Sequence, residues 1–453
     1  MKRLIVFALP VLFVCAALAQ EPGRGAAPGA AGRAAGGGRG PAVVSPEVHP
    51  DRTVTLRIVA PNAKAVTVSG EIMGTNPAAA LTRDESGVWS VTLGPLEPEI
   101  YSYGFNVDGM TVNDQRTSYV KPSSSYTSQV VVPGDGPQFY DARPVPHGDL
   151  RIVVYEAKTL DGMVRRMRVY TPPDYDSSNR RYPVLYLFHG AGDWDVAWTD
   201  VGRANLILDN LIAEGKAKPM IVVMPSIFQQ PALGSGAMAP RAAASGAPAG
   251  ARAATPATGA APAGAAATGR AGAPAAGQDD GFTRELLNDI MPLIQKRYRV
   301  LTGPDNTAIA GLSMGGGQAL RSGLAHLDTF HYVIGLSSAV GMGGGRAAAP
   351  AAAPGAAPAA APAGGAAAAP AAPPDPTAAY PALMKDVQAA NKKLKVFNMY
   401  CGKQDSLVIA GNKALASALL AKGVKVNYIE GEGGHWFIVW RRNLRDFAPL
   451  LFR

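Results

Sequence analysis

Residues 308–318 read Ala-Ile-Ala-Gly-Leu-Ser-Met-Gly-Gly-Gly-Gln, a short apolar run that reaches a serine flanked by glycines. The apolar half predicts a buried strand, and the glycine-rich half predicts a tight turn into a helix. A Gly-x-Ser-x-Gly turn of this kind is strained, and it presents the serine hydroxyl at the top of a sheet. Ser313 is therefore a candidate nucleophile. The pattern is short for a chain with 52 glycines, so the surrounding segments must support it.

The segments on both sides of this turn alternate between apolar strands and helices. Strands are expected at residues 182–190, 220–225, 308–312, 332–336, 396–401 and 424–429, and helices at 204–214, 282–298, 412–421 and 441–452. Near-continuous apolar strands that alternate with helices predict a mostly parallel sheet covered on both faces. Residues 152–155 and 166–170 predict an antiparallel opening to this sheet. The sequence thus predicts an α/β domain over residues 147–453.

Residues 45–135 carry a different pattern. Short segments with period-two alternation occur, without helices between them, at residues 54–59, 65–68, 88–93, 101–107 and 128–132. They predict a small all-β sandwich. The order of Trp89, Tyr101, Tyr103 and Phe105 resembles that of early-set immunoglobulin-like modules in front of carbohydrate-active enzymes, which would imply contact with a glycan. We favour the alternative that Trp89, Tyr103 and Phe105 are core residues and that the module is a spacer or brace.

Four segments have compositions that do not predict a packed fold. Residues 1–19 have the charged start, the apolar run and the Ala-Leu-Ala end of a signal peptide, which predicts a secreted or periplasmic protein. Residues 20–44 predict a disordered linker. Residues 231–277 and 343–374 are almost entirely Ala, Gly and Pro, and they predict disordered insertions. Because Cys401 is the one cysteine beyond the leader, no intramolecular disulfide is expected.

The charge and motif content disfavours several classes of protein. Most of the net charge of +9 lies in the leader and in arginines of the low-complexity segments. The remaining chain therefore lacks the basic footprint of a nucleic-acid-binding protein. No segment after the leader is long and apolar enough for a membrane span. No ligand spacing predicts a metal, and no dinucleotide fingerprint or phosphate-binding loop predicts a cofactor.

A serine nucleophile needs a base, and that base needs an acid to orient it. His435 lies in a glycine-rich loop after the last strand, where a base can reach the serine. His326 and His331 follow Ser313 too closely to return to the top of the sheet. Asp405 follows the strand at 396–401 and is the candidate acid, with a helix N-cap as its alternative role.

The oxyanion of the reaction needs backbone N–H donors close to the serine. We expect them from Met314 and from Gly190 or Ala191, in the loop after the strand that contains Phe188. His189 ends the same strand, before the serine turn, and is interpreted as a structural residue.

Several motifs agree with one known family in their order along the chain. They are His189-Gly190-Ala191-Gly192, Trp198, residues 204–216, the serine turn, Cys401-Gly402 to Asp405-Ser406, and Gly433-Gly434-His435. Together they resemble carbohydrate esterase family one, and most of all its bacterial feruloyl esterases. The resemblance implies an α/β-hydrolase fold and a triad of Ser313, Asp405 and His435. The substrate-binding residues are expected to be Trp194, Trp198 and Trp436.

This resemblance implies a serine esterase that removes feruloyl or acetyl groups from plant cell-wall polysaccharide such as xylan, through an acyl-enzyme and without a cofactor. An esterase for a siderophore of the enterochelin type, or for a small ester, is an alternative. An alternative of another class is a non-catalytic glycan-binding protein on a hydrolase scaffold. The sequence departs from the family in the insertions and around Trp194 and Trp436, so the choice of substrate stays open.

Overall fold

The computed structural model describes residues 43–123, 127–228, 279–340 and 375–453. The predicted signal peptide and both predicted insertions lie outside the described residues, as does the predicted linker up to Ala42.

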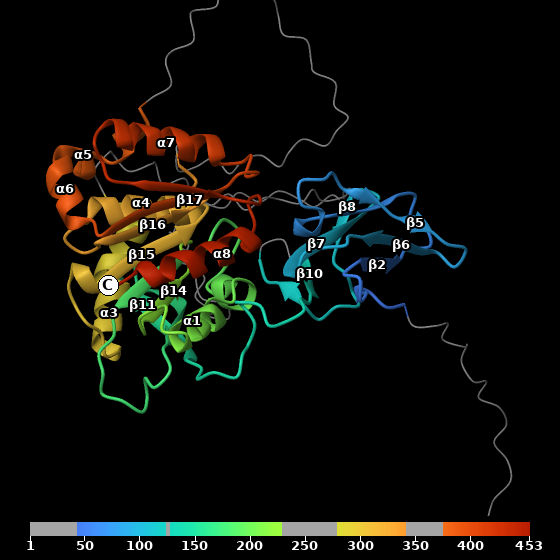
Figure 1. Ribbon diagram of the computed structural model, residues 1–453, viewed down its shortest axis with the longest axis horizontal. Coiled ribbons are helices and arrows are strands. Elements are labelled where there is room, and N and C mark those ends of the chain that lie inside the picture. The colour runs from blue at the N-terminus through green and yellow to red at the C-terminus, as the bar shows by residue number, and fades with distance from the viewer. Residues whose placement is uncertain (1–42, 124–126, 229–278, 341–374) are drawn as a thin grey trace, which may run out of the picture. The chain divides into compact units, whose positions relative to one another are not determined.

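An eight-stranded sheet forms the centre of the C-terminal part, in the order β11-β12-β14-β13-β15-β16-β17-β18 (Figure 1). Its strands are β11 (Asp149–Ala157), β12 (Met163–Thr171), β13 (Val184–Phe188), β14 (Ile221–Pro225), β15 (Thr307–Leu312), β16 (Tyr332–Leu336), β17 (Val396–Gly402) and β18 (Asn427–Gly431). β12 is antiparallel to both of its neighbours, whereas each adjacent pair from β14 to β18 is parallel. The predictions of a mostly parallel sheet and of an antiparallel opening are confirmed.

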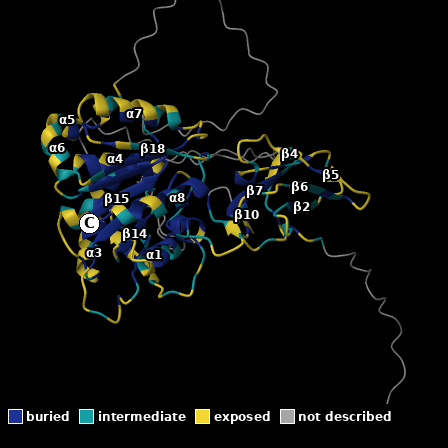
Figure 2. Cartoon of the chain, viewed as in Figure 1, coloured by how far each residue is buried: buried dark blue, intermediate teal, exposed yellow. Residues whose placement is uncertain are grey.

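Helices cover both faces of this sheet. They are α1 (Ala204–Ala213), α2 (Gly281–Glu285), α3 (Met291–Arg297), α4 (Met314–Ala325), α5 (Pro381–Lys385), α6 (Val387–Lys393), α7 (Ile409–Ala421) and α8 (Phe437–Phe447). The helices α1 and α8 share one hydrophobic core with the sheet, and α3, α4 and α7 share the core on its other face. Every residue of β13, β14, β15 and β16 is consequently buried (Figure 2).

Three predicted helices and one predicted strand differ from the observed elements. The helix predicted at 412–421 begins three residues earlier, at Ile409, and the strand predicted at 424–429 is observed at Asn427–Gly431. The helix predicted at 282–298 contains a π-helical turn, η4 (Leu286–Ile290), between α2 and α3. The helix predicted to begin at Arg441 begins at Phe437 instead, one turn earlier. Its first N–H group is bound by a carboxylate from a distant part of the chain, which no local sequence signal shows.

The N-terminal part contains two sheets. One has the order β1-β2-β6-β5, and the other has the order β4-β3-β7-β10-β9, with β8 paired to β7. Their strands are β1 (Glu47–Val48), β2 (Val54–Val59), β3 (Val66–Ser69), β4 (Ala79–Ala80), β5 (Thr82–Arg83), β6 (Val88–Leu93), β7 (Glu99–Val107), β8 (Met110–Val112), β9 (Val120–Lys121) and β10 (Thr127–Val132).

The two N-terminal sheets share one hydrophobic core and therefore form a sandwich. Trp89, Tyr103 and Phe105 lie in this core, and the indole N–H of Trp89 donates to the Ala60 carbonyl at 2.9 Å. These rings are therefore not available to stack on a glycan, as the brace interpretation predicts.

Candidate active site

The serine turn joins β15 to α4 at a strained residue. Ser313 has φ 54° and ψ −119°, a backbone conformation that a residue with a side chain adopts only under constraint. A side chain on Gly311 would collide with the Gly315 carbonyl, and one on Gly315 would collide with the His189 carbonyl. The glycines therefore allow α4 to start directly against the ends of β15 and β13.

The structure brings Ser313, His435 and Asp405 together at this edge of the sheet. The Oγ of Ser313 lies 2.8 Å from Nε2 of His435, and Nδ1 of His435 lies 2.8 Å from Oδ2 of Asp405. The carboxylate of Asp405 can only accept, so Nδ1 carries a proton and Nε2 of the neutral ring is free to accept from the serine hydroxyl. This arrangement can remove the proton from the hydroxyl as it attacks a carbonyl carbon.

Asp405 is buried in the loop that follows β17, with 1% of its surface exposed. Its second oxygen, Oδ1, accepts only a long hydrogen bond from the Val408 N–H, at 3.4 Å. The N-cap residue of α7 is Val408, so Asp405 does not occupy the N-cap position. Nearby carboxylates turn elsewhere: Glu430 pairs with Lys413 at 3.0 Å, and Glu432 with Lys403 at 2.5 Å.

The predicted oxyanion donors lie beside the nucleophile. Met314 is the first residue of α4, and the first N–H groups of a helix have no partner within it. A side chain on Gly190 would come within 3.1 Å of the Ser313 Cβ, so the loop after β13 passes directly along the serine. Ala191 is the next residue of this loop and is exposed. The roles of Met314, Gly190 and Ala191 stay predictions.

The loop after β13 is held by three side chains along its length. Arg166 donates from Nε and Nη2 to both carboxylate oxygens of Asp195, at 2.9 and 2.7 Å. Lys121 lies 3.3 Å from the carboxylate of Asp193. The indole N–H of Trp198 donates to the Phe188 carbonyl at 2.9 Å. These contacts keep the loop against the serine turn.

The three tryptophans predicted to bind substrate differ in burial. Trp198 is only 1% exposed and packs in the core with α1 and α8, which contradicts its prediction as a substrate-binding residue. Trp194 and Trp436 are partly exposed. Their prediction as substrate-binding residues stays open, because an aromatic residue in a motif gives no sign of which way its ring turns.

His189 joins the ends of two strands. Its Nδ1 donates to the Gly190 carbonyl at 2.8 Å, and its Nε2 accepts from the Ile227 N–H at 3.2 Å. Burial lowers the pKa of His189, which favours the neutral ring that these two bonds require. The residue is structural, in agreement with the sequence interpretation.

Aromatic rings support the imidazole from the side of α8. The ring of Trp440 packs edge-to-face on His435, with 5.0 Å between ring centroids. Phe437 packs on Trp440 at 5.0 Å and on Trp198 at 5.9 Å. Sequence reasoning missed Phe437 and Trp440, because the predicted helix began after both of them.

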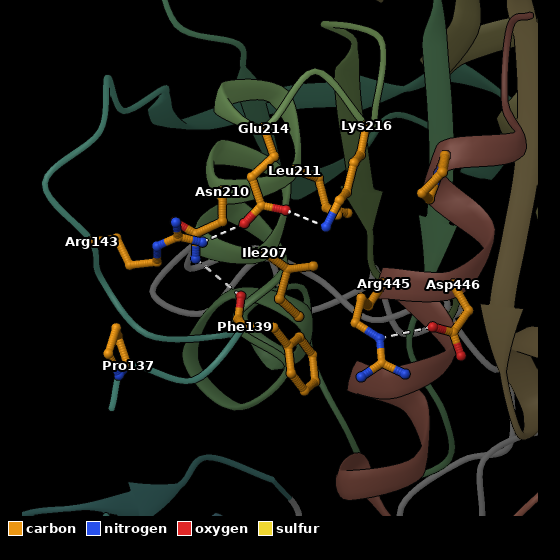
Figure 3. A pocket seen from close by; sticks show the side chains of 11 residues that line it. Pro137, Phe139, Arg143, Ile207, Asn210, Leu211, Glu214, Lys216, Arg445 and Asp446 are labelled. Atoms are coloured by element: carbon orange, nitrogen blue, oxygen red, sulfur yellow. Dashed lines mark hydrogen bonds and ion pairs between the residues drawn. The ribbon is translucent and has the colours of Figure 1, made fainter. Parts of the chain in front are cut away.

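A cavity of about 550 Å³ lies apart from the triad, between α1, α8 and the segment before β11 (Figure 3). Its charges are paired with one another. Glu214 accepts from Arg143 at 2.5 Å and from Lys216 at 2.8 Å, and Arg445 donates to Asp446 at 2.7 Å. No triad residue lines this cavity.

Within the described residues, no group of three or more His, Cys, Asp or Glu could hold a metal ion. No helix among residues 43–123, 127–228, 279–340 and 375–453 is long and apolar enough to cross a membrane.

A Ser-His-Asp arrangement at the edge of a mostly parallel sheet defines the α/β-hydrolase class. The model of the family described as "Putative esterase" matches residues 160–450, and the chain belongs to this family. The predicted relation to esterases is confirmed. A crystal structure of the enterobactin esterase of Shigella flexneri has the same fold, with a TM-score of 0.56 and 14% identity over 88% of this chain and 92% of that one.

The relatives found by sequence include a xylanase/feruloyl esterase and an acetyl esterase. The endo-1,4-beta-xylanase/feruloyl esterase of Xylanibacter ruminicola is 28% identical over 419 residues, which are 90% of this chain and 46% of that protein. The acetyl esterase of Caldicellulosiruptor saccharolyticus is 31% identical over 162 residues, 36% of this chain and 58% of that protein. The chain spans about half the length of these two relatives.

Proposed function

We propose that the protein is a serine esterase that hydrolyses feruloyl or acetyl esters on plant cell-wall polysaccharide such as xylan. The observation that carries the proposal is the hydrogen-bonded series from Ser313 through His435 to Asp405, with 2.8 Å at each step. The substrate class is supported by the relatives, which are named as a xylanase/feruloyl esterase and an acetyl esterase.

The reaction proceeds in two halves. Ser313 Oγ attacks the ester carbonyl while His435 Nε2 takes its proton, and the N–H groups near Met314 and Gly190 bind the oxyanion. The imidazolium then protonates the alkoxide oxygen as the C–O bond of the tetrahedral intermediate breaks, which releases the alcohol and leaves the acyl-enzyme. Water attacks the acyl group, His435 takes the proton of that water and returns it to Ser313, and the carboxylic acid departs.

Replacing the nucleophile tests the proposal. Ser313→Ala should lower kcat for a p-nitrophenyl acyl ester by as much as about a million-fold, since it removes the atom that forms the covalent bond. The matched control is Ser406→Ala, an exposed serine in the Asp405 loop, which should behave as the wild type. Activity of Ser313→Ala within tenfold of the wild type, with the fold intact, would refute the assignment.

The substrate class needs its own comparison. We expect methyl ferulate or acetylated xylan to be hydrolysed with a higher kcat/KM than a catecholate trilactone. The opposite order would favour a siderophore esterase. Labelling of the wild type by a fluorophosphonate probe separates an esterase from a non-catalytic glycan-binding protein, because the probe reacts with an activated serine.

Residues 1–19 are proposed to direct the protein out of the cytoplasm, which their composition supports. Mass spectrometry of the exported protein should find a new N-terminus after Ala19.

The N-terminal sandwich is proposed to be an early-set immunoglobulin-like module, and two sheets around one core support this. Whether it contacts glycan can be measured by pull-down on insoluble xylan with Ser313→Ala.

A further inference from the structure

Three charged side chains of the N-terminal sandwich reach the segments that hold the candidate active site. They are Glu71, Glu99 and Lys121, and their partners lie on α8 and on the loop after β13. Residues Val43–Arg453 form one compact unit, which contains both parts of the chain. The sandwich is therefore packed on the hydrolase fold, and Ile438 of α8 belongs to the core of the sandwich.

Glu71 caps the helix that follows the candidate base. Its Oε1 accepts from the Phe437 N–H at 3.1 Å, and its Oε2 accepts from the Ser102 N–H at 3.1 Å. The N-cap residue Trp436 forms no side-chain cap of its own. A carboxylate at this end of a helix satisfies a free N–H and interacts favourably with the helix dipole. The capped residue is two positions from His435.

Glu99 holds the next turn of the same helix. Its Oε1 accepts from Nη2 of Arg441 at 2.7 Å, and both side chains are almost completely buried. Arg441 also donates to the carbonyls of Ile100 and Val201, at 2.9 and 3.0 Å. These bonds fix the rotation of α8 about its axis and its position along that axis. Removal of Glu99 would leave the buried charge of Arg441 without a carboxylate, so this pair is unsuitable for a test that requires a folded variant.

Lys121 contacts both sides of the candidate site. Its Nζ lies 3.3 Å from the carboxylate of Asp193, three residues beyond Gly190 in the loop that is expected to supply an oxyanion donor. The same ammonium lies 5.1 Å from the ring centroid of Phe437, the first residue of α8. One side chain thus touches the loop beside the nucleophile and the helix behind the base.

We propose that Glu71 and Lys121 are positioning residues, through which the sandwich sets the geometry of His435 and of the loop after β13. The inference rests on the proposed esterase function. Neither residue needs to touch substrate. Glu71 acts through Phe437, which packs on Trp440 behind the imidazole, and Lys121 acts through both Phe437 and Asp193. When the start of α8 loosens, fewer molecules hold Nε2 at 2.8 Å from Oγ, and kcat falls without a change in substrate affinity.

The test compares variants of the full chain with a p-nitrophenyl acetate assay and with the rate of fluorophosphonate labelling of Ser313. Glu71→Ala should lower kcat and the labelling rate about tenfold, with KM within about twofold, as expected for the loss of a helix cap that holds the base. Lys121→Met should lower kcat several-fold, and Lys121→Arg should restore most of it, since arginine can still pair with Asp193. Glu85→Ala and Lys64→Met, at exposed positions of the same sandwich, are the matched controls and should leave kcat unchanged.

The measured constants distinguish a positioning role from a structural role. If Glu71→Ala and Lys121→Met lower Tm but leave kcat unchanged, or raise KM alone, the positioning role is overturned. If Glu71→Ala does not fold, the comparison of Lys121→Met with Lys121→Arg decides. Failure of Lys121→Arg to restore kcat would then overturn the inference. A wild type that neither hydrolyses the ester nor reacts with the probe would overturn the esterase function itself, and this inference with it.

Discussion

The substitution Asp405→Asn should separate the two contributions of the buried acid to catalysis. Both oxygens of Asp405 face N–H groups, Nδ1 of His435 at 2.8 Å and the Val408 amide at 3.4 Å. An asparagine has one acceptor oxygen and one NH2 group, so in either orientation a donor faces a donor. If the NH2 faces the ring, the ring proton moves to Nε2, which can then no longer accept from Ser313.

The expected loss follows from these two orientations. The wrong tautomer should lower kcat by about 10⁴-fold, which corresponds to about 5.4 kcal/mol of transition-state stabilisation. If the oxygen faces the ring, the tautomer survives. The negative charge that stabilises the imidazolium is still lost, and we expect a decrease of at least about 10²-fold.

The assay is kcat for p-nitrophenyl acetate, measured beside the Tm of each variant. Asp446→Asn is the matched control, because this aspartate lies on the surface of α8, half exposed and paired with Arg445. Its kcat should equal that of the wild type. If Asp405→Asn remains folded and loses less than tenfold in kcat, another group orients His435 and the assignment of Asp405 is wrong.

Two further predictions concern stability. Gly315→Ala should lower the free energy of unfolding by about 1–3 kcal/mol, because the new Cβ meets the His189 carbonyl, and an unchanged Tm would show that α4 can move away from β13. His147 donates to Asp209 and to the Arg143 carbonyl, both at 2.9 Å, so the charged ring is favoured and Asp209 raises its pKa. His147→Ala should therefore reduce Tm most below about pH 6.5, where the ring is charged. The reduction should become smaller as the pH rises through the raised pKa of His147. Equal reductions in Tm at about pH 6 and about pH 9 would contradict this.

The sequence predicted those elements whose signal is local. The strands at residues 54–59, 88–93 and 332–336 have the predicted bounds, because alternation or continuous apolar character marks a strand within its own few residues. The start of α8 was not predicted, since the first N–H of this helix is bound by Glu71, 366 residues away in sequence. Contacts at such a distance leave no periodic pattern.

Residues of the candidate site were likewise predicted where the sequence carries a signal and missed where their role depends on distant contacts. Ser313, Asp405 and His435 could be chosen because the order of motifs and strands restricts which residues can meet at one edge of a sheet. Trp198 was misassigned because its burial depends on α1 and α8, which pack on it from elsewhere in the chain. Lys121 carried no signal, since an isolated lysine in a β-rich segment is usually a surface residue.

The loop that carries His435 shows why such distant contacts matter. Its glycines allow the backbone many conformations, and Gly433 adopts φ 113°. A catalytic base must instead be held in one position. Contacts before and after His435 restrict the conformation of this loop. Gln404 accepts from the Gly433 N–H at 2.6 Å and donates its own N–H to the Gly433 carbonyl at 3.0 Å, and the residue two positions after His435 is held by Glu71. The position of the base is thus set by the neighbours of the loop, so changes that loosen either anchor should reduce kcat before they reduce the stability of the fold.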